Sequence, residues 1–153
     1  PLWLKQIRWI RRIICGFVHI MEFVATFIVL AIGGIADAGY LAYKHRQKKP
    51  LACPLDHDCS HVTESKWAAI FGVRNDILGL LYYVGMLGGI LLMLTVPVYA
   101  GILRTLLMVG ASLGLIFSAF LTVIQFTTIK DYCFYCLISA GLNLLLFINM
   151  FAL

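Results

Sequence analysis

Three uncharged stretches in the second half of the chain decide what it can fold into. They cover residues 77–103, 105–129 and 132–153. Each is longer than the roughly 20 apolar residues that a transmembrane helix needs. A fourth stretch, residues 13–43, is interrupted by Glu22 and Asp37 but keeps an uncharged core. With 62% hydrophobic and only 12% charged residues, the composition excludes an ordinary soluble domain and predicts an all-α membrane protein.

The predicted fold is a four-helix transmembrane bundle that forms a single domain over residues 1–153. Its spans are expected at about residues 16–43, 77–96, 101–129 and 132–153. The loop at 44–76 is the only long polar segment of the chain. A short amphipathic helix is expected inside it over residues 60–73, with Gly72 at its end. A loop of this length between two spans is usually functional.

Basic residues lie mostly in the flanks and loops, and the net charge is +5. This distribution suits contact with anionic lipid headgroups and gives no indication of nucleic-acid binding. Residues 2–12 mix bulky apolar and basic side chains at roughly helical spacing, which predicts an amphipathic segment at the membrane interface. No cleavable signal peptide is expected, because the apolar stretch that follows is too long for one.

The most informative motif is the pair Cys133 and Cys136, which opens the last apolar stretch. At helical spacing the two sulfurs lie one turn apart and can close a small disulfide. The partial positive charge of a helix N-terminus favours the thiolate, most of all at Cys133. A structural cysteine pair gains little from this setting, whereas a redox couple gains reactivity. We therefore interpret the pair as redox-active.

Cys53 and Cys59 form a second pair in the loop at 44–76. In a protein with four spans, this loop and the turn before the last helix emerge on the same membrane face, so the two pairs can meet. Together they predict a two-stage thiol relay that works through mixed disulfides. A hydrophobic electron acceptor in the lipid phase, such as a quinone, would complete it. The count of basic residues mildly favours the opposite sidedness, and we assign the site to the extracytoplasmic face from the redox chemistry.

These features resemble the vitamin K epoxide reductase family, in its bacterial and archaeal disulfide-forming branch. The resemblance covers the chain from about residue 33 to residue 153. Besides the loop pair, it rests on Ser65, on the sequence Asn75-Asp76-Ile77-Leu78-Gly79, and on Cys133-Phe134-Tyr135-Cys136. The other quinone-linked disulfide oxidase family with four spans has its C-x-x-C in the first loop, and therefore fits poorly.

The resemblance implies a role for each paired cysteine. Cys53 would be the partner of Cys59 and the point that an external thioredoxin-like protein attacks. Cys59 would exchange with Cys133 through a disulfide between the pairs. Cys136 would lie nearest the quinone (ubiquinone, menaquinone or a similar one) and pass electrons to it. Ser65 and Asn75 match family positions that line the quinone site. The further residues expected to wall this site are Phe71, Leu78, Tyr82, Leu121 and Phe134.

The implied activity is that of a quinone-dependent disulfide oxidoreductase, integral to the plasma or inner membrane, which supports disulfide bond formation. The sequence departs from the vertebrate branch at Ala140, where a tyrosine involved in vitamin K binding has the matching place. Reduction of a quinone epoxide, as in vertebrates, is the alternative enzyme activity. Many bacterial relatives carry a fused thioredoxin-like domain. The sequence contains no region that resembles one, so we expect the thiol partner of this chain to act in trans.

Simpler interpretations exist for several of these residues. Cys53 and Cys59 could form a purely structural disulfide, and the four paired cysteines could bind zinc, which would make the chain a non-enzymatic membrane module. The spacing is poor for zinc, and no metal is expected. Ser65 and Asn75 could merely cap helices. Asp37 is a functional candidate because it lies in a span, although a bond to a loop amide or a basic residue is the simpler expectation.

Overall fold

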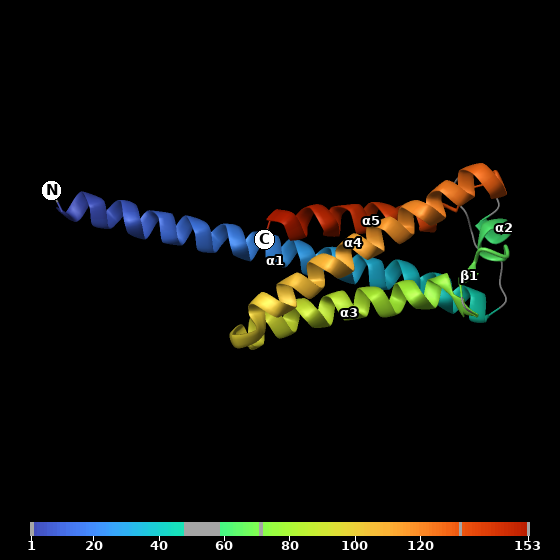
Figure 1. Ribbon diagram of the computed structural model, residues 1–153, viewed down its shortest axis with the longest axis horizontal. Coiled ribbons are helices and arrows are strands. Elements are labelled where there is room, and N and C mark those ends of the chain that lie inside the picture. The colour runs from blue at the N-terminus through green and yellow to red at the C-terminus, as the bar shows by residue number, and fades with distance from the viewer. Residues whose placement is uncertain (1, 48–58, 71, 132, 153) are drawn as a thin grey trace.

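The computed structural model describes residues 2–47, 59–70, 72–131 and 133–152, and only the backbone of residues 2–20, 60 and 152. Its long helices are α1 (Leu2–Arg46), α3 (Asn75–Thr95), α4 (Ala100–Ile124) and α5 (Phe134–Ala152). Its short elements are the helix α2 (Cys59–Thr63) and the strands β1 (Ala69–Ile70) and β2 (Val73–Arg74). The long helices run side by side, and α2 and the two strands cover one end of them (Figure 1).

Within the described residues, four helical segments are long and apolar enough to cross a membrane. They are Met21–Arg46, Asn75–Thr95, Pro97–Ile129 and Phe134–Phe151. This confirms the predicted all-α transmembrane bundle and makes the chain an integral membrane protein. The outer faces of the bundle carry exposed large apolar side chains, such as Val29, Leu81 and Ile116, because they contact lipid rather than water.

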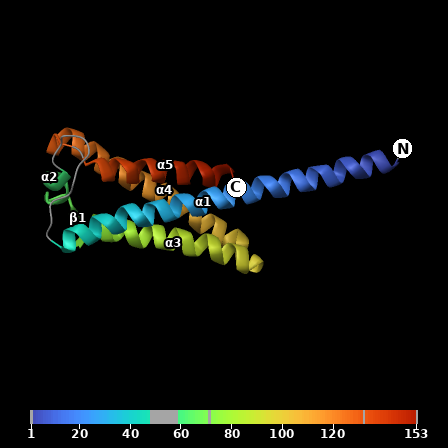
Figure 2. The same cartoon turned by 180° about the vertical axis from the view of Figure 1, so that it is seen from behind.

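The first helix is continuous over its whole described length. The sequence predicted an interfacial segment over residues 2–12 followed by a span, and α1 joins the two without a break. Its N-terminal part projects beyond the other helices, as both views show (Figure 2).

The helices pack in a closed ring, in which α1 contacts α3 and α5, and α4 contacts the same two helices. The core contains Phe27 of α1, Tyr83 and Ile90 of α3, and Leu146 of α5. The ring of Tyr83 lies directly against Gly34 of α1, where a Cβ atom would overlap it. Gly34 therefore permits the close approach of α1 and α3.

The turn between α3 and α4 is short because proline interrupts the helix. Val96 leaves the helical conformation after Thr95, and a 3-10 turn over Pro97–Tyr99 leads directly into α4. Proline has no N–H to donate to the preceding turn. The result is a tight hairpin of two spans at the end of the bundle opposite α2 (Figure 1).

The prediction of a helix over residues 60–73 is wrong beyond Thr63. The helix α2 ends there, and a β-hairpin follows in which Ala69 pairs with Arg74 and Ile70 with Val73. Gly72 adopts a positive φ of 79°, which glycine accepts without steric cost and which a tight hairpin turn requires. The hairpin leads into α3 and fixes the segment from α2 to α3 as a cap over the bundle.

Candidate functional site

The C-x-x-C pair lies where the chain enters α5, beneath the cap. Cys133 immediately precedes the helix and is 0% exposed. Its carbonyl oxygen accepts a hydrogen bond from the N–H of Leu137 at 3.1 Å. Its own N–H, which no helical carbonyl can reach, donates to Oε1 of Gln125 at 3.2 Å. The reactive pair is therefore anchored to α4 through a buried amide side chain.

Gln125 reaches Cys133 because the end of α4 is locally unwound. Residues Gln125–Ile129 form a π-helical turn, and Lys130 follows in the left-handed conformation with φ of 57°. The N–H of Asp131 donates to the carbonyl oxygen of Gln125 at 3.3 Å and closes the turn. Such π-turns are frequent at functional sites. The sequence reasoning missed Gln125, although a polar residue inside an apolar span is itself a signal.

The two sulfurs of the motif are not equivalent. A hydrogen bond from the Cys136 thiol lowers the pKa of Cys133, and the backbone N–H groups of Cys136 and Tyr135 act in the same direction. Burial opposes them, as does the charge of Asp37. This direction agrees with the effect expected of a helix N-terminus, and it makes Cys133 the sulfur that more readily becomes a thiolate.

The cap brings the loop pair to the C-x-x-C pair. Cys59 is 1% exposed and belongs to one apolar cluster with Val62 of α2 and Cys133. Cys59 is held in a disulfide, whereas Cys133 and Cys136 are free thiols. Cys53 lies outside the described residues. Two of the paired cysteines that the sequence predicts to exchange thus lie in the same cluster.

Polar side-chain contacts hold the cap against the helices below it. Arg74 Nη2 lies 3.2 Å from Asp76 Oδ2 and 3.5 Å from the carbonyl oxygen of Thr63. His61 Nδ1 lies 3.6 Å from Asp131 Oδ2, in the turn before α5. These contacts tie α2 both to the start of α3 and to the turn that carries Cys133.

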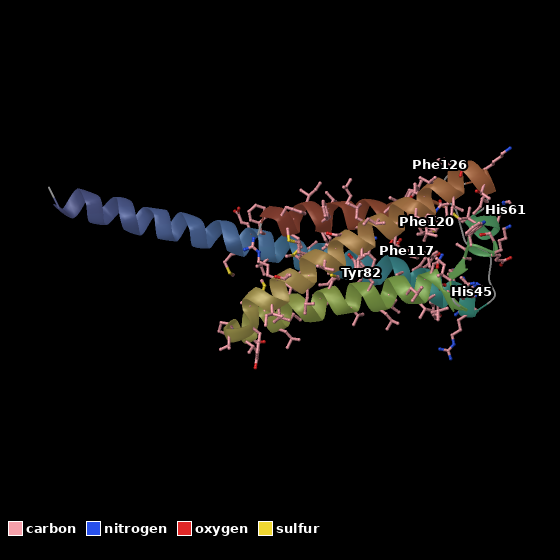
Figure 3. The ribbon with its side chains drawn as sticks, in the orientation of Figure 1. His45, His61, Tyr82, Phe117, Phe120 and Phe126 are labelled. Atoms are coloured by element: carbon pink, nitrogen blue, oxygen red, sulfur yellow. The ribbon has the colours of Figure 1, made fainter. Side chains whose placement is uncertain are left out.

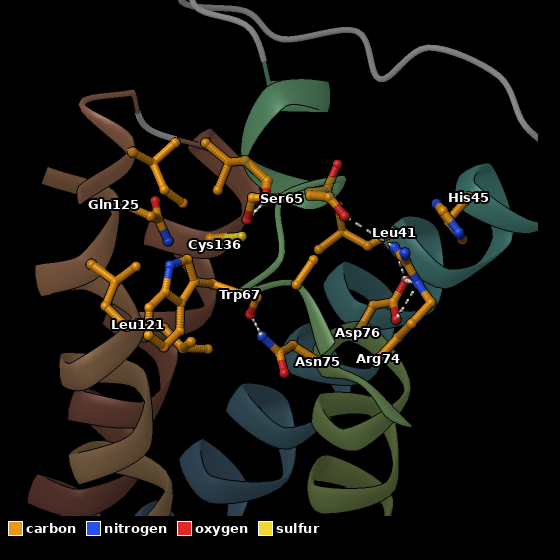
Figure 4. A pocket seen from close by; sticks show the side chains of 15 residues that line it. Leu41, His45, Ser65, Trp67, Arg74, Asn75, Asp76, Leu121, Gln125 and Cys136 are labelled. Carbon is orange, nitrogen blue, oxygen red and sulfur yellow. Dashed lines mark hydrogen bonds and ion pairs between the residues drawn. The ribbon is translucent and has the colours of Figure 1, made fainter. Parts of the chain in front are cut away.

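A cavity of about 360 Å³ opens in the bundle between α1, α3, α4 and α5. Its walls are largely apolar, and Figure 3 shows Tyr82 and Phe117, two of the residues that line it, in the middle of the bundle. A smaller cavity of about 70 Å³ lies directly under the cap, with Ser65, Trp67 and Cys136 in its wall (Figure 4). The residues that line both cavities are Leu41, Asn75, Asp76, Leu121, Gln125 and Cys136. Cys136 is therefore at the junction of the two cavities.

The structure brings most of the sequence-predicted quinone-site residues to these cavities. Asn75 and Leu121 line both, Ser65 lines the small one, and Leu78 and Tyr82 line the large one. Phe134 lines neither and instead packs in the cluster of Cys59 and Cys133. Phe71 lies outside the described residues.

Ser65 and Asn75 also make local hydrogen bonds, but the expectation that Asn75 caps its helix is wrong, because α3 has Arg74 as its N-cap and no side-chain capping bond. The Ser65 hydroxyl donates to the carbonyl oxygen of Val62 at 2.8 Å, and Nδ2 of Asn75 donates to the carbonyl oxygen of Trp67 at 2.7 Å (Figure 4). These bonds hold the cap in shape. Both side chains also lie in the wall of the small cavity.

Several buried polar atoms in the cavity walls have no hydrogen-bond partner among the described residues. They are Trp67 Nε1, Asn75 Oδ1, Tyr82 OH and Asn143 Oδ1. Buried polar groups are nearly always paired, by protein, water or ligand. The Trp67 and Tyr82 groups are hydrogen-bond donors, which suits a ligand with carbonyl oxygens and an apolar ring. A quinone has this chemistry, so the residues present fit it. Sequence reasoning missed Trp67 and Asn143.

Among the described residues, no group of three or more His, Cys, Asp and Glu side chains could hold a metal ion.

A sequence model of the vitamin K epoxide reductase family matches residues 25–151. This match covers α1 from residue 25 onward, α3, α4, all of α5 but its last residue, the cap and both cysteine pairs. Comparison with curated proteins gave no match.

Proposed function

We propose that this chain, which belongs to the vitamin K epoxide reductase family, passes electrons from a thioredoxin-like protein to a membrane quinone through its two cysteine pairs. At the general level, membership makes the protein a quinone-linked thiol–disulfide oxidoreductase of the membrane. The finer proposal concerns the donor, which acts in trans, and the path, from Cys53 and Cys59 to Cys133 and Cys136. The net effect would be disulfide bond formation in the donor's substrates.

One observation carries this proposal more than any other. Cys136 lies in the wall common to both cavities, while Cys133, one helical turn away, packs in a buried cluster with Cys59. Cys136 also packs against that cluster, so the C-x-x-C pair adjoins Cys59 as well as the cavities, which supports transfer from Cys59 through this pair to an acceptor in the cavity. A purely structural disulfide or a zinc site requires no such cavity beside the sulfur.

The electron path follows from thiol–disulfide exchange. A reduced donor opens the loop disulfide, and the Cys59 thiolate attacks Cys133 in the Cys133–Cys136 disulfide, which releases Cys136 as a thiolate. Attack of Cys53 on Cys59 then restores the loop disulfide and leaves both helix cysteines reduced. For the three described cysteines of the two pairs, a bonded Cys59 with free Cys133 and Cys136 thiols is the pattern expected of this last state.

The helix pair then gives its two electrons to the quinone and returns to the disulfide. The apolar cavity walls exclude water, and Tyr82 and Trp67 offer buried donors for the quinone oxygens. Asn75 holds the Trp67 backbone in place through its 2.7 Å hydrogen bond. We propose that this site faces the extracytoplasmic side of the plasma or inner membrane, where thiol oxidants work.

Quinone reduction by the purified protein tests this function. Under anaerobic conditions, the protein receives a reduced thioredoxin-like protein and either ubiquinone or menaquinone, and quinol formation is followed. Turnover is expected in the wild type and in Cys15→Ser, a control in a cysteine outside both pairs, and is expected to vanish in Cys136→Ser and Cys53→Ser. Reduction of no quinone by the wild type, or unchanged turnover in Cys136→Ser, would overturn the proposal. Turnover of a quinone epoxide instead would favour the vertebrate-type activity.

A further inference from the structure

Asp37 is a carboxyl group inside a membrane span that the electron path above does not use. It lies within the spanning segment Met21–Arg46 of α1. The simpler expectation was a bond to a loop amide or a basic residue, but its Oδ2 atom is buried without a hydrogen-bond partner in the described part of the chain. Carboxyl groups in membrane spans are rare and are generally functional. The structure therefore leaves this group unexplained by packing or pairing.

The neighbours of Asp37 on α1 define its place in the bundle. Ala38 lines the large cavity, and the ring of Tyr40 lies 5.1 Å from the ring of Tyr135 on α5. Gly34, one turn earlier, abuts the ring of Tyr83 on α3. Asp37 is consequently on the part of α1 that packs against the beginning of α5, at the level of the C-x-x-C pair.

Electrostatic interactions connect Asp37 to the reactive pair. Its charge acts on Tyr83, Cys133 and Cys136. When ionised, it raises the pKa of Cys133, because two negative charges close together repel each other. Among the residues that the structure describes, the titratable groups around Asp37 are Tyr40 on its own helix, Tyr83 on α3, and Tyr135, Cys136 and Cys133 at the start of α5. None of them is a cation that could balance a permanent carboxylate.

An unpaired carboxylate is costly in an apolar environment, so the neutral acid is the form that this place tolerates. A neutral acid beside a dithiol can donate its proton and regain one. The ring of Tyr83 lies against Gly34, one turn before Asp37, and its hydroxyl donates to the carbonyl oxygen of Ser139 at 3.0 Å and lies 3.1 Å from Ser139 Oγ. Both residues line the large cavity. Two hydroxyl-bearing residues thus line the space proposed for the quinone together with Cys136.

We propose that Asp37 carries a proton for the Cys133/Cys136 couple, giving one toward the quinone and taking its replacement from a thiol. This inference rests on the function proposed above. Oxidation of the two thiols to a disulfide releases two electrons and two protons, and reduction of a quinone to a quinol consumes the same number. Asp37 gives its proton to one quinone oxygen and takes a proton from one thiol, so that it is protonated again at the end of each cycle. The proton of the other thiol reaches the second quinone oxygen by a separate route.

Asparagine at position 37 keeps the size of the side chain but cannot carry this proton. In Asp37→Asn, kcat for quinone reduction is expected to fall by about 10²-fold, the usual range for loss of a proton-transfer group, with the KM for quinone within about twofold of wild type. Asp37→Glu is expected to recover part of the rate. Glu22→Gln is the matched control, because Glu22 is a carboxyl of the same span but has an exposed side chain. An unchanged kcat in Asp37→Asn would overturn the inference.

A second readout needs no quinone. A small phosphine reduces the Cys133–Cys136 disulfide of the purified protein, and difference infrared spectroscopy records the C=O band of a protonated carboxyl group. A change in this band on reduction is expected in wild type and in Glu22→Gln and is expected to be lost in Asp37→Asn. The same band in Asp37→Asn would refute the assignment. If that variant does not fold, Asp37→Glu replaces it, with a shifted band supporting the inference and an unshifted band contradicting it.

These two measurements also separate the inference from the function on which it rests. The wild type could reduce no quinone and still have a carboxyl band that changes when the dithiol is reduced and that depends on Asp37. This result would contradict the proposed function, but it would still show that Asp37 is coupled to the thiols. A wild type that reduces quinone with neither rate nor band dependent on Asp37 would contradict the inference alone.

Discussion

The side chain of Gln125 accepts the hydrogen bond of the Cys133 backbone N–H at 3.2 Å, and so connects the π-turn of α4 to the first residue of the redox motif. Both groups are buried. The bond therefore matters less for its own strength than for the cost of leaving either group unpaired away from water.

Replacement of Gln125 by leucine removes this acceptor and is expected to destabilise the reduced protein by about 1–3 kcal/mol. Thermal unfolding in detergent measures the effect. Thr127→Val is the matched control in the same turn, because the Thr127 side chain is exposed and its hydroxyl bonds only locally, to the Val123 carbonyl and near Thr128. Equal Tm values for Gln125→Leu and Thr127→Val would show that the Gln125 bond does not support the motif.

The lowered pKa of Cys133 depends first on the hydrogen bond from Cys136. In Cys136→Ala that donor is absent, so the thiolate of Cys133 loses its main stabilisation and its pKa rises. The pH titration of thiolate absorbance in the reduced protein should then begin at a higher pH than in wild type, with Cys15→Ala unchanged. A midpoint that stays in place or moves to lower pH would contradict the assignment of Cys133 as the more acidic thiol.

The hydroxyl of Tyr82 is buried in the cavity wall without a partner among the described residues. Tyr82→Phe should not reduce the stability of the free protein, because it removes an unsatisfied polar group. It should nevertheless raise the KM for quinone by about 3- to 10-fold, since one hydrogen bond contributes about 0.5–1.5 kcal/mol. Tyr99→Phe, at the exposed turn before α4, serves as the control. A lower Tm with unchanged KM would mean that the hydroxyl has a structural role instead.

Gly34 and the Tyr83 ring are in contact, so a methyl group at position 34 would force the ring away from α1. Gly34→Ala is therefore expected to lower stability by about 1–3 kcal/mol, the usual cost of overpacking. Gly88→Ala is the matched control on α3, because nothing lies near its Cβ position, and alanine there favours the helix. Thermal unfolding of the two variants compares them directly. A Tm loss in Gly88→Ala equal to that in Gly34→Ala would contradict the packing argument.

Sequence patterns predicted the spans well because lipid imposes a simple rule of length and polarity. The family followed from the order and spacing of Cys53, Cys59, Cys133 and Cys136. The structure of the cap was harder to predict, because the apolar residues of 60–73 fit an amphipathic helix equally well. The hairpin is seen only in the structure, where Gly72 adopts a positive φ.

The polarity of Gln125 inside an apolar span singles the residue out, but its hydrogen bond to Cys133 could not be predicted. It depends on the π-turn and on the left-handed Lys130, which no periodicity in the sequence indicates. Trp67 and Asn143 were likewise missed, since aromatic and amide side chains near apolar segments are more often interface or packing residues. Their unpaired buried atoms are visible only once the helices are assembled.

We propose that Cys59 passes electrons to Cys133, and a disulfide trapped between these two sulfurs would demonstrate the transfer. In the double variant Cys53→Ser/Cys136→Ser, neither sulfur has its resolving partner, so mild oxidation should yield a Cys59–Cys133 disulfide. Peptide mapping by mass spectrometry identifies it, with Cys53→Ser/Cys133→Ser as the control that should not form it. Quantitative formation of the bridge is the predicted result. Recovery of Cys59 and Cys133 as separate thiols under the same oxidation would contradict the account.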